Sequence, residues 1–190
     1  MNIKTEKLTP RDFISIGIYG AISLVIFFVV GGIAGLTIVG TVANIPITSF
    51  FTSIAYMLLV LKVRKKGTFL IMGIINVLPG LMAAIGWAAA EVIASANHYQ
   101  SKKILVLTYV VGCTLQSALF TLPMYLSNAQ YLTERQEILH LTDAALQQYL
   151  SMFTWPVYAG MVLLTAVLSL LGAVISIRIL KKHFVKAGLI

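Results

Sequence analysis

Charged residues are scarce in this chain. Only 11% of its 190 residues are Asp, Glu, Lys or Arg, whereas 59% are hydrophobic, and its mean hydropathy is +0.94. An average soluble domain has roughly 25% charged residues. The composition therefore excludes a water-soluble globule. It also excludes a disordered chain, because disorder requires low hydrophobicity together with high net charge.

Residues that carry chemistry are scarce as well. The single Cys113 can form neither an internal disulfide nor a CxxC metal site. The three histidines (His98, His140 and His183) lie at the ends of apolar runs or in loops. There is no HExxH or GxSxG motif and no GxxxxGK[ST] nucleotide loop. We therefore expect no enzyme, no metal, no cofactor and no nucleotide hydrolysis by this chain itself.

Long apolar runs dominate what is present, and about 20 apolar residues cross a bilayer core. The run at 68–97 is too long for one crossing, and Pro79-Gly80 divides it, although one kinked helix would fit the hydropathy equally well. The sequence predicts a single all-α membrane domain (residues 1–190) with six transmembrane helices, at about 13–30, 46–61, 68–78, 81–96, 104–126 and 155–180.

Two connections are distinctive. Four glycines between residues 31 and 40 predict a loop or re-entrant segment after the first span, because glycine favours helix poorly. The polar connection 127–153 carries apolar residues at helical spacing. This pattern predicts a short amphipathic helix on the extracellular membrane face.

The basic residues indicate the orientation of the chain. With six spans, thirteen of the fourteen fall on one side: Lys4, Lys7, Arg11, Lys62, Arg64, Lys65, Lys66, Lys102, Lys103, Arg178, Lys181, Lys182 and Lys186. Only Arg135 lies opposite, in a loop with three acids. The positive-inside rule then predicts that both termini are cytoplasmic. The net charge of +8 is thus a topology signal, which removes nucleic acid as a partner, although docking of a protein at this face stays open.

Amides and aromatic residues occur mainly in the outer halves of the predicted spans. An amide in hydrocarbon needs a partner, and a buried pocket for a small heteroaromatic ligand would provide one. An interfacial aromatic belt would give a similar Trp and Tyr pattern, and Gln116 also suits helix-to-helix hydrogen bonding. The candidate ligand residues are Asn44, Asn76, Trp87, Gln116, Tyr125, Asn128, Trp155 and Tyr158.

Glu91 is the one acid well inside a predicted span, and we include it among the candidate ligand residues. A carboxylate is costly there and could bind a polar or cationic ligand. The alternative, which we favour, is a structural pairing with another helix or a nearby cytoplasmic base.

Small residues form faces on two spans. Gly17 and Ala21 stand four apart in the first, and the last carries Thr165, Ser169, Gly172, Ala173 and Ser176 along one face. Such faces allow helices to approach closely, either within the bundle or against another membrane protein. Internal packing is the default interpretation.

Four segments resemble the Trep_Strep family of bacterial integral membrane proteins: LTPRDFISIGIYGAI (Leu8–Ile22), AEVI (Ala90–Ile93) followed by Tyr99 and Ser101, LPMYL (Leu122–Leu126) and KKHFVKAG (Lys181–Gly188). That family is grouped with the substrate-binding S components of energy-coupling factor (ECF) transporters. The resemblance implies six helices in a bacterial cell membrane, with both termini inside.

The resemblance also implies a division of labour. An S component captures a vitamin-like solute outside and topples to release it inside, while a membrane T component and two ABC ATPases supply energy. Docking on the T component commonly uses an alanine-x-x-x-alanine motif, at which this chain has Gly17 and Ala21. Family pockets point by position to Asn44, Trp87, Tyr125, Asn128, Trp155 and Tyr158, and similar members are assigned hydroxymethylpyrimidine or vitamin B6-like ligands. The alternative function is a structural or assembly subunit without a ligand.

Overall fold

The computed structural model describes residues 7–76, 82–127, 130–134, 136–137 and 140–183. Within them the secondary structure is entirely helical. The helices are α1 (Pro10–Ala34), α2 (Ile38–Val42), α3 (Asn44–Lys62), α4 (Thr68–Asn76), α5 (Met82–Ala96), α6 (Lys102–Leu126), α7 (Gln130–Glu134), α8 (Asp143–Met152) and α9 (Trp155–His183). This confirms the predicted all-α class.

Helix α1 begins at Pro10, three residues before the predicted start of the first span. The Thr9 backbone N–H and hydroxyl both donate to the Asp12 carboxylate, at 2.7 Å each. Pro10 occupies the first helical position, where its missing N–H removes no intrahelical bond. A salt bridge of 2.9 Å from Lys65 to Asp12 ties this helix start to the turn after α3.

The end of α1 corrects the expectation for the glycine-rich segment. The helix continues through Gly31 and Gly32 to Ala34, four residues past the predicted end of the span. Backbone groups within hydrocarbon must bond internally, and this requirement outweighs the low helix propensity of glycine. Gly31 also admits the Asn44 side chain, whose Nδ2 donates to the Gly31 carbonyl at 2.9 Å. Only the short α2 interrupts the connection that follows.

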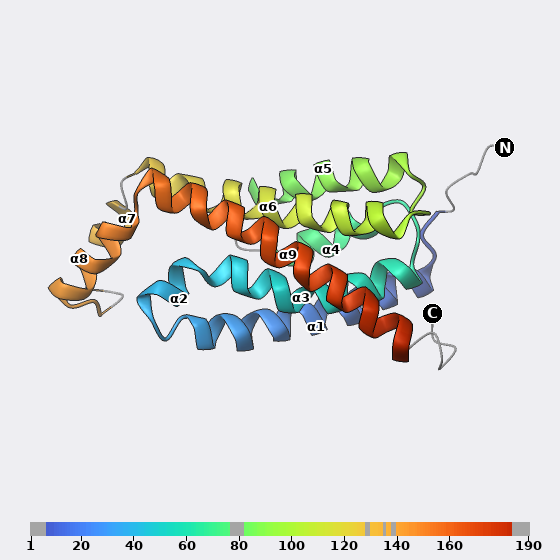
Figure 1. The fold of residues 1–190 in the computed structure, drawn as a ribbon, viewed down its shortest axis with the longest axis horizontal. Helices are drawn as coiled ribbons and strands as arrows, with labels where there is room; N and C mark the ends of the chain where they lie inside the picture. The colour runs from blue at the N-terminus through green and yellow to red at the C-terminus, as the bar shows by residue number, and fades with distance from the viewer. Residues whose placement is uncertain (1–6, 77–81, 128–129, 135, 138–139, 184–190) are drawn as a thin grey trace.

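Four helices (α1, α3, α6 and α9) are long and apolar enough to cross a membrane, and α5 is a shorter apolar helix. The chain is therefore a polytopic membrane protein. Residues 68–76 and 82–96 form the helices α4 and α5, which run in opposite directions (Figure 1). At 1.5 Å per residue they span about 14 and 22 Å, less than the roughly 30 Å of a bilayer core. The count of six crossings stays a prediction.

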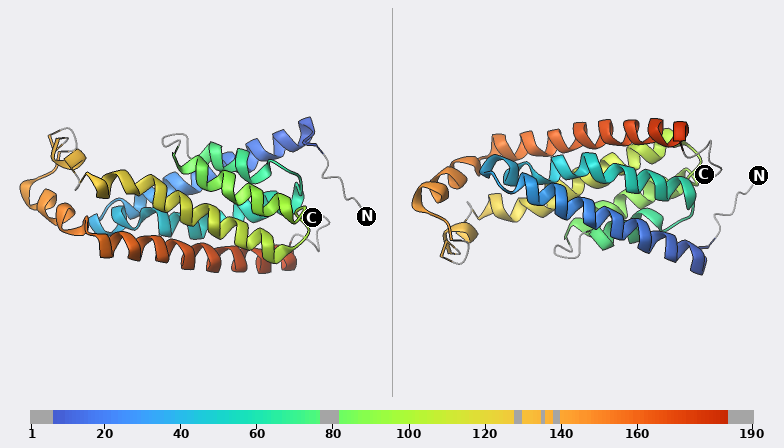
Figure 2. Two further views of the ribbon diagram at one scale, coloured as in Figure 1. Left: turned by 90° about the horizontal axis from the view of Figure 1, so that it is seen from above. Right: turned by 90° about the horizontal axis from the view of Figure 1, so that it is seen from below.

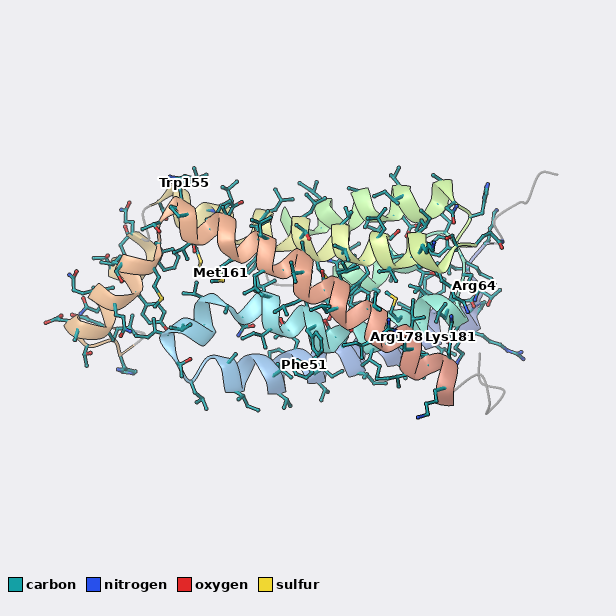
Figure 3. The ribbon with its side chains drawn as sticks, viewed as in Figure 1. Phe51, Arg64, Trp155, Met161, Arg178 and Lys181 are labelled. Atoms are coloured by element: carbon teal, nitrogen blue, oxygen red, sulfur yellow. The ribbon has the colours of Figure 1, made fainter. Side chains whose placement is uncertain are left out.

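Basic residues gather at one end of the bundle. The start of α1, the α3–α4 turn, the α5–α6 turn and the end of α9 all lie there (Figure 1). Arg64, Arg178 and Lys181 mark this basic end, and Trp155 lies toward the opposite end, beyond which α8 projects (Figure 3). Figure 2 shows α1 on one side of the bundle and α5 with α6 on the other.

Helix α3 lies at the centre, packed against α9 through small residues. A Cβ on Gly172 would clash with the Phe50 carbonyl oxygen of α3. The hydroxyls of Ser53 and Ser176 bond across this contact at 2.9 Å. The small-residue face of α9 therefore packs inside the bundle, as the default interpretation expected. The predicted amphipathic segment contains α8, whose Leu146 is buried, while the part of it at residues 138–139 lies outside the described residues.

Candidate functional site

A small polar cavity lies between α1, α3, α4, α5 and α6, and we call it the inner cavity. Its volume is about 30 Å³, enough for one or two water-sized groups. Hydroxyls, amides, aromatic rings and a thiol form its walls: Phe27, Ile45, Thr48, Ser49, Thr52, Tyr56, Asn76, Trp87, Cys113 and Gln116. None of these side chains is an acid or a base, so the inner cavity is polar without being charged.

The hydroxyls of the inner cavity come from α3. Thr48 donates to the Asn44 carbonyl at 2.8 Å, Ser49 to the Pro46 carbonyl at 2.7 Å, and Thr52 to the Thr48 carbonyl at 2.9 Å. Each proton is thus used on the helix's own backbone. Because a hydroxyl also has two acceptor lone pairs, these three groups present acceptors.

Trp87 forms the aromatic wall and is fully buried. Its ring stacks on Tyr56 with centroids 4.8 Å apart and an interplanar angle of 16°. Two glycines make room for it: a Cβ on Gly112 would lie 2.5 Å from the indole Cζ3, and a Cβ on Gly73 would clash with the indole Cγ. Close packing on both faces therefore fixes the position of Trp87.

Trp87 also determines which way Gln116 points. The indole Nε1 donates to Gln116 Oε1 at 2.8 Å. An indole N–H can only donate, so the amide oxygen must face it and the NH₂ group must point elsewhere. Among the described residues no acceptor bonds to that NH₂ group. Gln116 thus keeps two donors at the wall of the inner cavity.

Asn76 has its amide oriented in a comparable way. Its Nδ2 donates to the Met72 carbonyl and its Oδ1 accepts from the Ser23 hydroxyl, both at 2.8 Å. The bond with Ser23 joins α4 to α1 beside the inner cavity, whereas the bond to Met72 lies within α4. One of its two N–H groups is used on the backbone, so Asn76 retains a second donor.

A larger, mostly apolar cavity adjoins the inner one toward the end opposite the basic residues, and we call it the outer cavity. Its volume is about 280 Å³, and Phe27 and Ile45 line both cavities. The other lining residues are Thr41, Val42, Asn44, Phe120, Thr121, Met124, Tyr125, Tyr149 and Phe153. Helix α8 covers this cavity, and its Tyr149 hydroxyl donates to the Thr41 hydroxyl of α2 at 3.3 Å.

A family model described as a hypothetical bacterial integral membrane protein (Trep_Strep) matches residues 10–186. The chain belongs to the Trep_Strep family. The predicted location in a bacterial membrane is therefore confirmed. No curated protein and no solved structure matches the chain.

Five of the nine candidate ligand residues of this Trep_Strep protein line the two cavities. Asn76, Trp87 and Gln116 belong to the inner cavity, and Asn44 and Tyr125 to the outer. The Oδ1 atom of Asn44 is buried without a partner in the described part of the chain. Asn128 lies outside the described residues.

Trp155 and Tyr158 lie beside the outer cavity and line neither one. The Tyr125 ring is 5.0 Å from Tyr158 and 6.5 Å from Trp155, measured between centroids. Trp155 is 55% exposed, and the Tyr158 hydroxyl donates to the Ala118 carbonyl at 3.1 Å. These two residues support the cavity wall from behind.

Glu91 lies away from both cavities, near the basic end. It is 6% exposed and accepts from the backbone N–H of Gly67 at 2.8 Å and of Leu70 at 3.3 Å, at the start of α4. The Ser95 hydroxyl donates at 2.8 Å and the Tyr99 hydroxyl at 2.6 and 2.7 Å. Burial and the adjacent carboxylate raise the pKa of Tyr99. These contacts agree with the structural alternative of pairing with another helix, which here is the start of α4.

Gly17 and Ala21 lie on the outward face of α1, and both are exposed. A Cβ on Gly17 would meet nothing within 4 Å. Within the described structure, this small-residue face is therefore not part of the internal packing.

Sequence reasoning missed the α3 hydroxyls and the α8 cover. The run Thr48-Ser49-Phe50-Phe51-Thr52-Ser53 repeats a pair of hydroxyls one helical turn apart. That spacing places them on one helix face and could have indicated a polar stripe. The contact of α8 with α2 has no comparable local signal.

Proposed function

We propose that this protein is the S component of an ECF-type importer and captures a small heteroaromatic vitamin or vitamin precursor. The observation that carries the proposal is the pair of adjoining cavities. Ligand sites combine an apolar, aromatic enclosure with a few oriented polar groups. The outer cavity supplies the enclosure, and Gln116, Asn76 and the α3 hydroxyls supply the polar groups.

In this proposal the chain crosses the membrane six times, with α4 and α5 as the third and fourth spans. Its basic end faces the cytoplasm, in keeping with the positive-inside rule. The outer cavity then lies on the extracellular side beneath α8. A ligand would enter from outside and reach the polar groups last.

The chain is not an enzyme in this proposal, and its energy comes from partners. A membrane T component and two ABC ATPases would drive toppling of the S component and release of its ligand inward. The outward face of α1 at Gly17 and Ala21 supports this part of the proposal, because small exposed residues allow close helix-to-helix approach.

Ligand capture can be tested on the purified protein. Native mass spectrometry should detect one small molecule bound per chain. Titration with hydroxymethylpyrimidine or pyridoxine should change the fluorescence of a Trp155→Phe variant, in which Trp87 is the one remaining tryptophan. Failure to bind any member of a full vitamin panel, in a protein that also purifies without a small molecule, would refute capture.

A second function, a ligand-free assembly subunit, is favoured by one observation, the exposed small-residue face of α1. A pull-down from the native membrane separates the two functions. The carrier requires one membrane partner together with two P-loop ATPases. An assembly subunit would bring down a membrane partner without them.

A further inference from the structure

The absence of charge is common to every described wall of the two cavities. None of the residues that line the two cavities is Asp, Glu, Lys, Arg or His. A charged ligand would lose its hydration on entering these cavities and would find no opposite charge there. This loss costs several kcal/mol for a carboxylate or an ammonium. Neutral polar groups, in contrast, can be satisfied by the hydroxyls and amides already described.

The two cavities also differ in size and polarity, and this difference orients a ligand. The outer cavity of about 280 Å³ can hold a single aromatic ring beside Phe120, Tyr125 and Phe153. The inner cavity of about 30 Å³ has room for a substituent of one or two heavy atoms only. A ligand would therefore place its ring in the outer cavity and one small polar group in the inner cavity.

Hydrogen-bonding capacity defines that group further. Gln116 offers two N–H donors, because Trp87 fixes its oxygen. Thr48 and Ser49 offer acceptors, because their protons bond to backbone carbonyls of α3. The matching substituent both accepts and donates, as a hydroxymethyl group does. A carboxylate accepts only, and an ammonium donates only.

We infer that the site selects the uncharged form of its ligand. A neutral substituent accepts hydrogen bonds from the Gln116 amide and donates one to the α3 hydroxyls. The inference rests on the proposed function. It excludes carboxylates, phosphate esters and alkylammonium analogues of the same ring as substrates.

Matched probes that differ in charge and little in size test the inference. One pair is hydroxymethylpyrimidine and the same pyrimidine with a carboxylate in place of the hydroxymethyl group; the other is pyridoxine and 4-pyridoxate. Binding to the purified full-length protein is measured by tryptophan fluorescence and by calorimetry. We expect the neutral member to bind at least about 100-fold more tightly, since burying an uncompensated charge costs several kcal/mol.

The outcomes separate this inference from the proposed function. Equal or tighter binding of the acid overturns charge selection and leaves the S-component proposal intact. A charged molecule found bound to the purified protein does the same. If no neutral or charged compound binds and the protein purifies without a small molecule, the proposed function fails and the inference fails with it.

A charge introduced at Gln116 gives a second test. In Gln116→Glu an oxygen still accepts from Trp87, but the N–H donors are replaced by a carboxylate. Affinity for the hydroxymethyl compound should fall about tenfold or more. Affinity for the aminomethyl analogue, a cation, should rise. Gln100→Glu, an exposed residue near the basic end, is the matched control and should change neither affinity.

Thr48→Val keeps the inference testable if Gln116→Glu does not fold. It removes one acceptor at nearly constant shape and should weaken the neutral ligand several-fold, with no gain for the aminomethyl cation. An unchanged affinity for the neutral ligand in either folded variant would show that the inner cavity does not bind the substituent, and would overturn the inference.

Discussion

Buried polar groups are bonded differently at the basic end of the bundle and at the inner cavity. At the basic end, the Glu91 carboxylate is surrounded by two backbone N–H groups and the hydroxyls of Ser95 and Tyr99. Midway along the bundle, Gln116 keeps donors and α3 keeps acceptors beside the inner cavity. A satisfied network stabilises a fold, whereas spare bonding capacity next to a cavity is available to a ligand. Burial alone does not distinguish the two.

Replacing Glu91 should cause the largest loss of stability. Glu91→Leu leaves the Gly67 and Leu70 N–H groups and the Tyr99 hydroxyl without their acceptor, which should cost about 3 kcal/mol or more. Thermal unfolding in detergent measures this loss. Glu137→Leu, on an exposed residue, is the control and should change little. Unchanged stability combined with lost ligand binding would instead assign Glu91 to the ligand site.

Crowding Trp87 should have the next largest effect. A Cβ on Gly112 would lie 2.5 Å from the indole Cζ3, so Gly112→Ala must displace the ring. We expect a loss of about 2 kcal/mol from overpacking, a shifted tryptophan emission spectrum and weaker ligand binding. Gly160→Ala meets nothing within 4 Å and is the matched control. Wild-type emission and affinity in Gly112→Ala would show that Trp87 is not held as described.

Opening the α8 cover should change kinetics more than stability. Phe153 is half-buried and lines the outer cavity from the end of α8. Phe153→Ala should speed ligand dissociation several-fold in stopped-flow fluorescence. Tyr149→Phe, which removes only the hydroxyl bond to Thr41, should change the rate less. Identical dissociation in all three proteins would argue against α8 as a cover.

The smallest effect on the isolated protein is expected at Gly17. Gly17→Leu adds bulk where a Cβ meets nothing, so stability and ligand binding should stay unchanged, while uptake by cells expressing the complete transporter should be abolished. Gly32→Leu, at another open position near the far end of α1, should preserve uptake. Loss of binding in Gly17→Leu would place this residue in internal packing instead.

Much of the fold was predictable because each membrane span needs a run of about 20 mostly apolar residues, and such runs are visible in the sequence. The long helices α3, α6 and α9 begin and end within three residues of their predicted bounds. The glycine-rich end of α1 was mispredicted, since local helix propensity is a weak influence where backbone groups have no water to bond.

The site was predictable only in part. Asn76 and Gln116 are conspicuous in apolar runs, so sequence alone could select them. Serine and threonine are common in membrane helices, and their side chains can bond to their own backbone, so Thr48 and Ser49 gave no comparable signal. The contact between Tyr149 and Thr41 joins residues 108 positions apart and depends on tertiary structure.

The bonds from the α3 hydroxyls to their own backbone also bear on how the protein is made. This helix has the lowest mean hydropathy of the four long ones, and it is synthesised before α6 and α9, against which it packs. With the protons of Thr48, Ser49 and Thr52 already bonded within the helix, α3 carries fewer unsatisfied donors into lipid. Helix α3 can therefore enter the bilayer before α6 and α9 have been synthesised.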